Sequence, residues 1–192
     1  MTVIKDRRMD ILQAALHIFS KKGYHNAKIE DIAMEAGIAK GTIYQYFSSK
    51  QDLFQQMFRH GVERYGQSLQ EIATNESHIR DKLLALAQSH GKFLEEHIGM
   101  SEIMPKESKL MSKEMRCWVL EQRDHAFSSL EEMIEQGIAL GEVREDTDKG
   151  VAVLAIIGSL FAYYEKESRN KEMKFEEISP MPWVDFILRA LQ

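Results

Sequence analysis

With 192 residues, 44% of them hydrophobic and only three of them proline, the chain is long enough to bury a core, and its apolar residues recur at helical spacing. No apolar run reaches the roughly 20 residues of a membrane-spanning helix, no secretory leader is recognisable, and the single cysteine excludes an intrachain disulfide. We therefore expect a cytoplasmic, all-α protein. The net charge of −5 is uneven, because residues 1–60 carry nine Lys/Arg against six Asp/Glu whereas residues 61–192 carry 16 against 24. This imbalance favours attraction of phosphates at the N-terminal end only.

The apolar periodicity predicts about nine helices. In the first, apolar residues at positions i, i+3, i+4 and i+7 share one face, and Gly23 ends the helix. Asn26 is the expected cap of the second helix, and Ser49 and Asp52 form a capping box that begins the fourth. The predicted helical ranges are about 6–22, 29–36, 40–47, from 49 onwards, 78–97, 112–140, 150–164 and 182–191.

The segment KIEDIAMEAGIAKGTIYQYF has the pattern of a helix-turn-helix. Such a motif needs inward apolar residues on both helices, a small residue where they cross and a glycine in the turn. Ile32, Ile38 and Ile43 supply the apolar contacts. Ala33 is the small crossing residue, and Gly37 allows the left-handed backbone of the turn. The sequence therefore predicts a DNA-binding motif near the N-terminus.

The exposed face of the third predicted helix concentrates groups that suit nucleic acids. Lysine and hydroxyl groups match phosphate oxygens, glutamine can read adenine through paired hydrogen bonds, and glycine allows close backbone approach. The alternative is that the two tyrosines are core aromatics, one of them half-buried, and that the lysine is merely solvated. The side chains concerned are Lys40, Gly41, Thr42, Tyr44, Gln45 and Tyr46, with Lys50 beside the start of the fourth helix.

These segments resemble the TetR family of transcriptional regulators. The resemblance is carried by GYHNAKIEDIAMEAG (residues 23–37) and GIAKGTIYQYFSSKQDLF (residues 37–54), and it continues more loosely over residues 137–164. The family-type region spans about residues 5–65, with the helix-turn-helix motif at 28–47.

The resemblance implies a three-helix DNA-binding domain over residues 1–50 and a helical ligand-binding and dimerisation domain over residues 51–192. Two positions depart from the family pattern, because Lys28 stands where threonine is common and Ala39 where serine is common. Lys28 then becomes a candidate phosphate contact. The DNA-binding residues so implied are Lys28, Lys40, Gly41, Thr42, Tyr44, Gln45, Tyr46 and Lys50.

The helix over residues 150–164 is apolar nearly all round and is expected to be buried on every side. Two copies of it, with the last helix alongside, could form a four-helix bundle between two subunits, as the family resemblance also implies. The alternative is a helix buried inside one subunit. The predicted dimer residues are Leu154, Ile157, Gly158, Phe161, Trp183, Phe186 and Ile187.

A small-molecule site is expected among the middle helices, as the resemblance implies. Methionine and aromatic side chains can line an apolar cavity, and His or Arg can anchor an anionic head group. The plainer alternative is that the methionines fill the core and the arginines lie in solvent. A lipophilic anion such as an acyl-CoA is expected, because the chain loosely resembles fatty-acid-responsive members. The predicted pocket residues are His90, Phe93, His97, Met104, Met115, Trp118, Arg123 and Phe127.

No catalytic or metal-binding constellation is recognisable in the sequence. The seven histidines include no pair four residues apart, and neither a phosphate-binding glycine loop nor a Gly-x-Ser-x-Gly elbow occurs. We therefore expect no metal and no cofactor. Cys117, beside Arg116, is either a redox-sensitive thiolate or a buried, inert cysteine.

Together with the TetR resemblance, the sequence implies a repressor rather than an enzyme. It would bind a pseudo-palindromic operator as a homodimer, because one short recognition helix seldom gives enough affinity. A small-molecule effector would release it from DNA. The alternatives are a helical enzyme and a protein-binding adaptor, each with a head domain that does not bind DNA.

Overall fold

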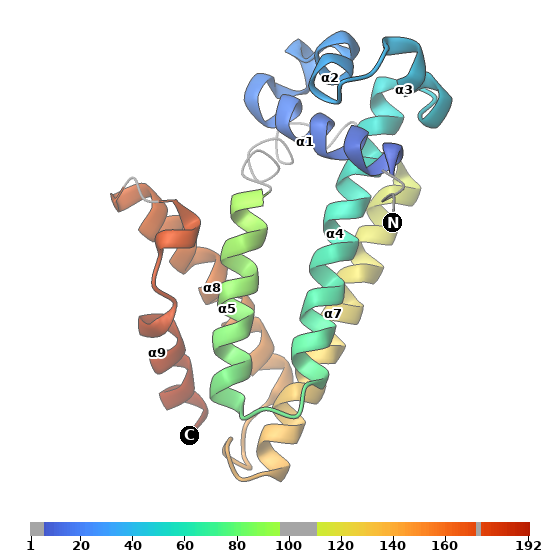
Figure 1. Ribbon diagram of the computed structural model, residues 1–192. Coiled ribbons are helices and arrows are strands. Elements are labelled where there is room, and N and C mark those ends of the chain that lie inside the picture. Colours follow the sequence, from blue (N-terminus) through green and yellow to red (C-terminus); the bar gives the residue numbers. More distant parts are fainter. Residues whose placement is uncertain (1–5, 97–110, 172–173) are drawn as a thin grey trace, which may run out of the picture. The chain divides into compact units, whose positions relative to one another are not determined.

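The computed structural model describes residues 6–96, 111–171 and 174–192. Within these ranges it contains eight α-helices, one short 3-10 helix and no strand (Figure 1), which confirms the all-α prediction. The elements are α1 (Arg7–Asn26), α2 (Ile29–Glu35), α3 (Lys40–Tyr46), α4 (Lys50–Thr74), α5 (Ile79–Glu96), α7 (Lys113–Ala139), α8 (Lys149–Lys171), η2 (Phe175–Glu177) and α9 (Met181–Leu191).

The chain forms two units, and the division falls within α4 and within α7 rather than between helices. The described residues of 6–62 and 111–118 make up the first unit, and those of 63–96 and 119–192 make up the second. The functional boundary predicted near residue 50 stays a prediction.

The first unit is built around the packing of α1 on α2 and of α2 on α3. Asp6 caps α1, because its carboxylate accepts hydrogen bonds from the backbone N–H groups of Arg8 and Met9. The core of the unit is aromatic and aliphatic, and the rings of Phe19 and Phe54 meet edge to face at 5.5 Å between centroids. This core fixes the three N-terminal helices on the first turns of α4.

The sequence predicts that the first helix ends at Gly23, and the structure has a break there but continues α1 beyond it. Gly23 has φ 72° and ψ 161°, a backbone conformation that costs glycine little, and a further short helical stretch follows before α1 ends at Asn26. The prediction that Asn26 caps α2 is wrong. Lys28 occupies the cap position, and the Asn26 side chain instead donates to the backbone oxygen of Lys22, because the chain is still helical there.

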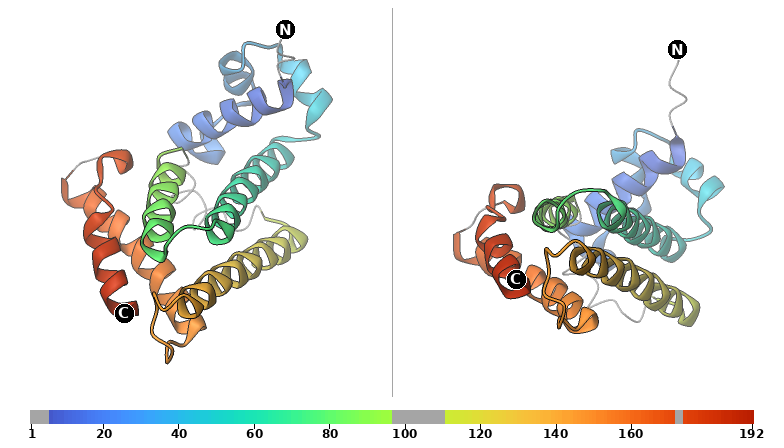
Figure 2. Two further views of the ribbon diagram at one scale, coloured as in Figure 1. Left: turned by 60° about the horizontal axis from the view of Figure 1, so that its bottom comes forward. Right: turned by 90° about the horizontal axis from the view of Figure 1, so that it is seen from below.

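In the second unit, α5, α8 and α9 lie side by side (Figures 1 and 2). The close approach of α5 and α8 depends on Gly91, since a Cβ atom there would lie 2.8 Å from Cε1 of Tyr164. The Tyr164 hydroxyl donates to the backbone oxygen of Ala87 at 2.8 Å, so the ring is held in place. Helix α8 extends to Lys171, beyond the predicted end at residue 164.

Two polar groups join the ends of helices in the second unit. The carboxylate of Glu142 accepts from the backbone N–H of Ile79 at 2.8 Å and so satisfies a donor at the start of α5. The buried Lys82 donates from Nζ to the backbone oxygen of Ala73 and to Oε1 of Gln136, both at 2.9 Å. These bonds tie α5 to the end of α4 and to α7. None of the helices in the described ranges has the length and hydropathy that crossing a bilayer requires.

Candidate nucleic-acid interface

The turn between α2 and α3 has the geometry that the sequence predicts. Gly37 adopts φ 66°, and the backbone N–H of Ile38 donates to the oxygen of Ala33 at 2.9 Å, which closes the turn. Ile32, Ala33 and Ile43 are buried, each with at most 3% of its surface exposed, whereas Ile38 is half-buried. The two helices are therefore held as a helix-turn-helix by the predicted contacts.

The opposite face of α3 is exposed. Tyr44 and Tyr46 have 49% and 41% of their surface accessible, so the interpretation of these rings as core aromatics is wrong. Gln45 and Gly41 are also exposed, and no atom lies within 4 Å of a Cβ built on Gly41. Only Thr42 is half-buried. The exposed face of α3 therefore presents two phenol groups, an amide group and the unobstructed backbone at Gly41. These groups can approach phosphate oxygens and base edges.

Lys40 begins α3 and is paired with an acidic residue of α2. Its Nζ lies 2.7 Å from Oε1 of Glu30, and both side chains are more than half exposed. The hydrogen bond from Lys40 lowers the pKa of Glu30, and the same bond raises the pKa of Lys40. Both groups are therefore charged at neutral pH. The sequence analysis did not predict the pair with Glu30. Glu30 stands ten residues before Lys40, on the other side of the predicted helix-turn-helix turn, and this opposite charge could have indicated the pair.

The other two predicted cations occupy different settings. Lys50 is half-buried, with its Nζ 4.4 Å from the centre of the Tyr24 ring and 3.4 Å from the backbone oxygen of His25. Lys28 is exposed, and its backbone N–H donates to the carboxylate of Asp31 at 3.1 Å. No sequence pattern indicated the contact between Lys50 and Tyr24, because the two residues lie on α4 and α1.

The start of α4 confirms part of the predicted capping box. The backbone N–H of Asp52 donates to Oγ of Ser49 at 3.0 Å. The Asp52 carboxylate reaches one residue further than predicted, because it accepts from both the backbone N–H and the hydroxyl of Ser48, at 2.7 and 2.9 Å. These bonds fix the direction in which α4 follows α3.

Two family models match this chain. One, described as "Bacterial regulatory proteins, tetR family", matches residues 11–57, and the other, described as "Tetracyclin repressor-like, C-terminal domain", matches residues 76–165. The first contains the whole α2–turn–α3 motif, and the two together cover well over half of the chain. The chain belongs to the TetR family. It is a DNA-binding transcriptional regulator with an N-terminal helix-turn-helix and a helical C-terminal domain.

Similar proteins include a fatty acid metabolism regulator and a transcriptional repressor. The "Fatty acid metabolism regulator protein" of Bacillus subtilis is 26% identical over 156 residues, which span 81% of this chain and 80% of that protein. The "HTH-type transcriptional repressor KstR2" of Mycobacterium tuberculosis is 24% identical over 76% of this chain and 73% of that one. The crystal structure of FadR from Bacillus subtilis in complex with stearoyl-CoA superposes with a TM-score of 0.69 over 95% of this chain and 96% of that one, at 23% identity.

The pocket residues expected from the TetR resemblance fall into three groups. His97 and Met104 lie outside the described residues. Met115 and Trp118 belong to the first unit, where Met115 is buried and the Trp118 ring stacks on the Arg59 guanidinium at 4.5 Å. The second unit holds the other four, namely His90, Phe93, Arg123 and Phe127.

Within the second unit, Tyr65 brings two of these residues together. Its hydroxyl lies 2.8 Å from Nδ1 of His90, and its ring stacks on Phe93 at 4.4 Å. Arg123 is exposed and pairs with its neighbour Asp124, while its guanidinium lies 5.9 Å from the Phe127 ring. The sequence reasoning missed Tyr65, although it follows Phe58 by seven residues on the apolar face of α4.

His90 is fully buried, and this changes its expected role. Burial lowers the pKa of its imidazole to about 4, so the ring is neutral at pH 7. An uncharged ring offers an anionic head group no ion pair, and the place of His90 in a ligand pocket stays a prediction. A neutral imidazole can still donate or accept a hydrogen bond.

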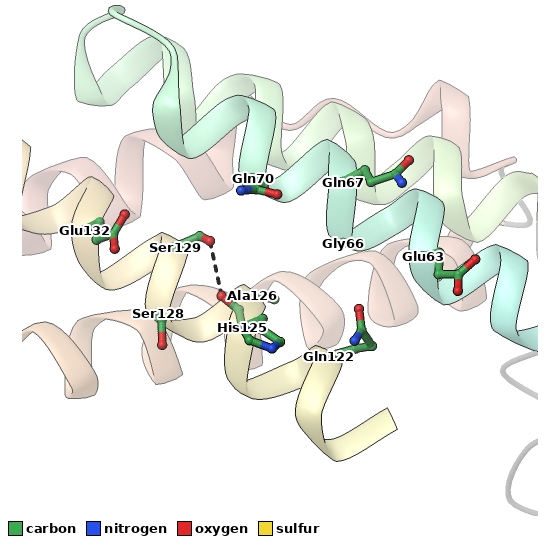
Figure 3. A pocket seen from close by; sticks show the side chains of 10 residues that line it. All are labelled: Glu63, Gly66, Gln67, Gln70, Gln122, His125, Ala126, Ser128, Ser129 and Glu132. Atoms are coloured by element: carbon green, nitrogen blue, oxygen red, sulfur yellow. Dashed lines mark hydrogen bonds between the residues drawn. The ribbon is translucent and has the colours of Figure 1, made fainter. Parts of the chain in front are cut away.

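A polar groove separates the second-unit portions of α4 and α7, with a volume of about 430 Å³. Figure 3 shows the carboxylate, amide and hydroxyl side chains along its two walls, and the hydrogen bond from Ser129 Oγ to the His125 backbone oxygen. The predicted pocket residues that the structure describes do not line this groove. Its lining residues are Glu63, Gly66, Gln67, Gln70, Gln122, His125, Ala126, Ser128, Ser129 and Glu132.

Helix α8 buries one face in its own subunit and exposes the other. The buried face packs in the core with Trp183 and Ile187 of α9, which are each 4% exposed. The exposed face carries Leu154 and Phe161, and Phe186 of α9 is 67% exposed. The alternative of a helix buried wholly inside one subunit is therefore wrong, and its burial between two subunits stays a prediction. The remaining predicted dimer residues are Ile157, which is half-buried, and Gly158, which is exposed.

Cys117 is exposed, so its interpretation as a buried, inert cysteine is wrong. Among the residues that the structure describes, no group of three His, Cys, Asp or Glu side chains is placed to hold a metal ion. The two relatives named above are, by their names, a metabolism regulator and a transcriptional repressor.

Proposed function

We propose that this protein is a repressor that binds a pseudo-palindromic operator as a homodimer and leaves it when a lipophilic acyl thioester binds the C-terminal domain. The observation that carries the proposal is the outer face of α3. There Tyr44, Gln45 and Tyr46 are exposed around an open Gly41, directly opposite the buried anchor Ile43. An exposed helix of this chemistry suits the major groove.

In the operator complex, we assign different roles to the proposed contacts. Gln45 would read a base edge, because its amide can donate and accept at once. The hydroxyls of Thr42, Tyr44 and Tyr46 would contact the phosphate backbone or sugar edges. Lys28, Lys40 and Lys50 would lie near phosphates. Lys50 would then supply charge from a position fixed by the Tyr24 ring.

The proposed homodimer uses the exposed face of α8. This face is formed by Val151, Leu154, Ala155, Gly158 and Phe161, all exposed and all uncharged. Covering an apolar strip of this kind with a second copy of the chain lowers the free energy, because apolar surface leaves water. A two-fold axis would place the strip of one subunit against the same strip of its partner. Phe186 of α9 would extend the contact, while Trp183 and Ile187 would support it from within the subunit core.

The proposed effector class rests on the relatives. One is named as a fatty acid metabolism regulator, and the similar FadR structure contains stearoyl-CoA. The neutral, buried His90 suits an uncharged carbonyl better than a carboxylate, because it carries no positive charge at pH 7. A lipophilic thioester has such a carbonyl beside an apolar chain. Effector and DNA would then weaken each other's binding reciprocally.

The first test is selection of bound fragments from genomic DNA, followed by affinity measurements on the selected sequence. We expect an enriched sequence with two-fold symmetry, and a loss of affinity when stearoyl-CoA is added. Gln45→Ala should change the sequence preference. Gln13→Ala is the control: it removes an exposed glutamine side chain from α1 of the same unit and should leave the sequence preference unchanged. Failure to enrich any sequence would contradict the proposed DNA binding, whereas enrichment without a response to stearoyl-CoA would contradict only the effector.

A further inference from the structure

The recognition helix α3 contains one charged side chain, Lys40, at its first position. The other six residues of the helix are uncharged. Sequence-independent attraction to DNA comes from cations that replace the counterions of phosphates. On α3 itself, this attraction therefore depends on whether Lys40 is available.

In the structure, Lys40 is held by Glu30 of α2, with 2.7 Å between Nζ and Oε1. We propose that Glu30 is a positioning residue that competes with DNA phosphates for Lys40 and thereby weakens the sequence-independent part of DNA binding. This inference rests on the proposed DNA binding through α3. Its chemical basis is that a carboxylate and a phosphate oxygen are alternative partners for the same ammonium group.

The neighbouring acidic residues of α2 have other partners. Asp31 pairs with Lys22 at 2.9 Å and accepts from the backbone N–H of Lys28, so it stabilises the start of α2. Glu35 lies at the end of α2, with its carboxylate 3.9 Å from Nε2 of His17 on α1. Glu30 alone among these three acids pairs with a residue of the recognition helix.

When the protein binds DNA, Lys40 bonds either to Glu30 or to a phosphate, and in both cases Glu30 makes the affinity lower than it would be without the carboxylate. If Lys40 stays with Glu30, the recognition helix neutralises no phosphate. If Lys40 moves to a phosphate, the exposed Glu30 carboxylate is left beside a polyanion, and the two repel each other. Removing the Glu30 charge relieves both costs. It should therefore raise affinity for duplex DNA of any sequence and add roughly one counterion to the number released on binding.

The test measures binding of the full chain to a random-sequence duplex as a function of salt concentration. The proteins are wild type, Glu30→Gln, Lys40→Gln, the double variant, and Glu35→Gln as the control. Glu35→Gln changes the net charge of the same helix by the same amount and leaves Lys40 in its pair. Thermal unfolding of each variant shows whether it is folded at the assay temperature.

We expect Glu30→Gln to bind more tightly than both wild type and Glu35→Gln. The slope of log K against log salt should steepen by about 0.9, so the loss of affinity between about 50 and 200 mM salt becomes roughly 3.5-fold larger. When Lys40→Gln is added to Glu30→Gln, the slope of log K against log salt should return to the less steep value, because the lysine that causes the steepening is gone. In the wild-type background the same substitution should change the slope by less, because Glu30 already holds Lys40.

Two results would overturn the inference while leaving the proposed function intact. In one, Glu30→Gln and Glu35→Gln have the same affinity and slope, so any gain comes from net charge alone. In the other, Glu30→Gln binds more weakly, so that Glu30 itself contacts DNA. Failure of the folded wild-type protein to bind either random or selected DNA would instead reject DNA binding through α3, and the inference with it.

Discussion

The Tyr65 hydroxyl of α4 and Nδ1 of His90 on α5 lie 2.8 Å apart inside the second unit. Either group can be the donor, and one polar hydrogen stays unpaired in each case: Nε2–H of His90 when the phenol donates, and the phenol O–H when Nδ1 donates. Among the described residues Nε2 has no hydrogen-bond partner, and the ring is surrounded by the aromatic rings of Tyr65, Phe161 and Tyr164. The bond thus satisfies one of two buried nitrogens.

Tyr65→Phe should destabilise the fold by about 1–3 kcal/mol, because it leaves Nδ1 of His90 buried without a partner. Urea unfolding at pH 7 measures this difference. Tyr163→Phe is the matched control, since its hydroxyl donates to the backbone oxygen of the exposed Ser179. Water can replace that bond, so the control should cost less than about 1 kcal/mol. Equal losses in the two variants would show that the Tyr65 bond contributes nothing specific.

Acid should destabilise the protein through His90. Its pKa is lowered from 6.5 to about 4 by burial in the fold, so between these pH values the unfolded chain binds a proton that the folded chain does not. The free energy of unfolding therefore falls as pH drops from 6.5 toward 4, by on the order of 3 kcal/mol over the whole window. His90→Gln removes the titrating group. Its unfolding free energy should depend less on pH in this window, and an unchanged dependence would contradict the burial argument.

The surface pair of His78 and Glu142 should act in the opposite direction. The hydrogen bond between them raises the pKa of His78 above 6.5 and lowers the pKa of Glu142 below 4.5. The His78 contribution is complete below pH 6.5 and is lost as pH rises through the raised pKa, whereas that of Glu142 is complete above pH 4.5 and is lost in acid. The difference in melting temperature between wild type and His78→Gln should be largest between about pH 4.5 and 6.5. A difference that grows above pH 8 would contradict the pairing.

Gly91→Ala should destabilise the packing of α5 on α8. The new Cβ would lie 2.8 Å from a Tyr164 ring that is buried and hydrogen-bonded, so the ring cannot move aside without loss. We expect a cost of about 1–3 kcal/mol in chemical unfolding. Gly66→Ala, on α4 with no atom within 4 Å of the built Cβ, should instead gain up to about 1 kcal/mol of helix stability. A neutral Gly91→Ala would mean that the helices separate at little cost.

Leu154→Glu should dissociate the proposed dimer, because it places an unpaired charge in the centre of the apolar strip. The dimer dissociation constant, measured by sedimentation, should rise by at least about 100-fold, and affinity for the selected operator should fall with it. Leu140→Glu is the control, since Leu140 is 69% exposed directly after α7 and lies outside the α8 strip. Unchanged sedimentation of Leu154→Glu would reject this face as the interface.

The helix-turn-helix was predictable because its geometry depends on residues close together in the chain. Gly37 marks the left-handed turn, and Ile32, Ala33 and Ile43 have the spacing that brings two short helices into contact. The same holds for Ser49, which caps α4 three residues before its partner. Local hydrogen bonds and the helical period are enough to decide such features.

The prediction for α8 shows where periodicity stops being informative. A helix that is apolar on all sides gives no signal of which side its own subunit covers. Tyr164 and Leu160 turn inward because α5 and α9 offer complementary surfaces, whereas Leu154 remains outside. The sequence indicated that the helix has packing partners. Only the packing of the second unit showed which face is buried in the subunit and which face is exposed.

The sequence by itself determined the all-α fold and the helix-turn-helix motif, since these follow from spacing within one or two helices, whereas only the structure showed that Tyr44 and Tyr46 are exposed. The tertiary structure decided the partners of the charged and polar groups. Glu30 meets Lys40, Tyr65 meets His90 and Glu142 caps Ile79 across 10, 25 and 63 positions of the chain. Such pairings depend on how whole helices pack, because packing is set by the combined burial of many apolar residues rather than by the two groups that meet.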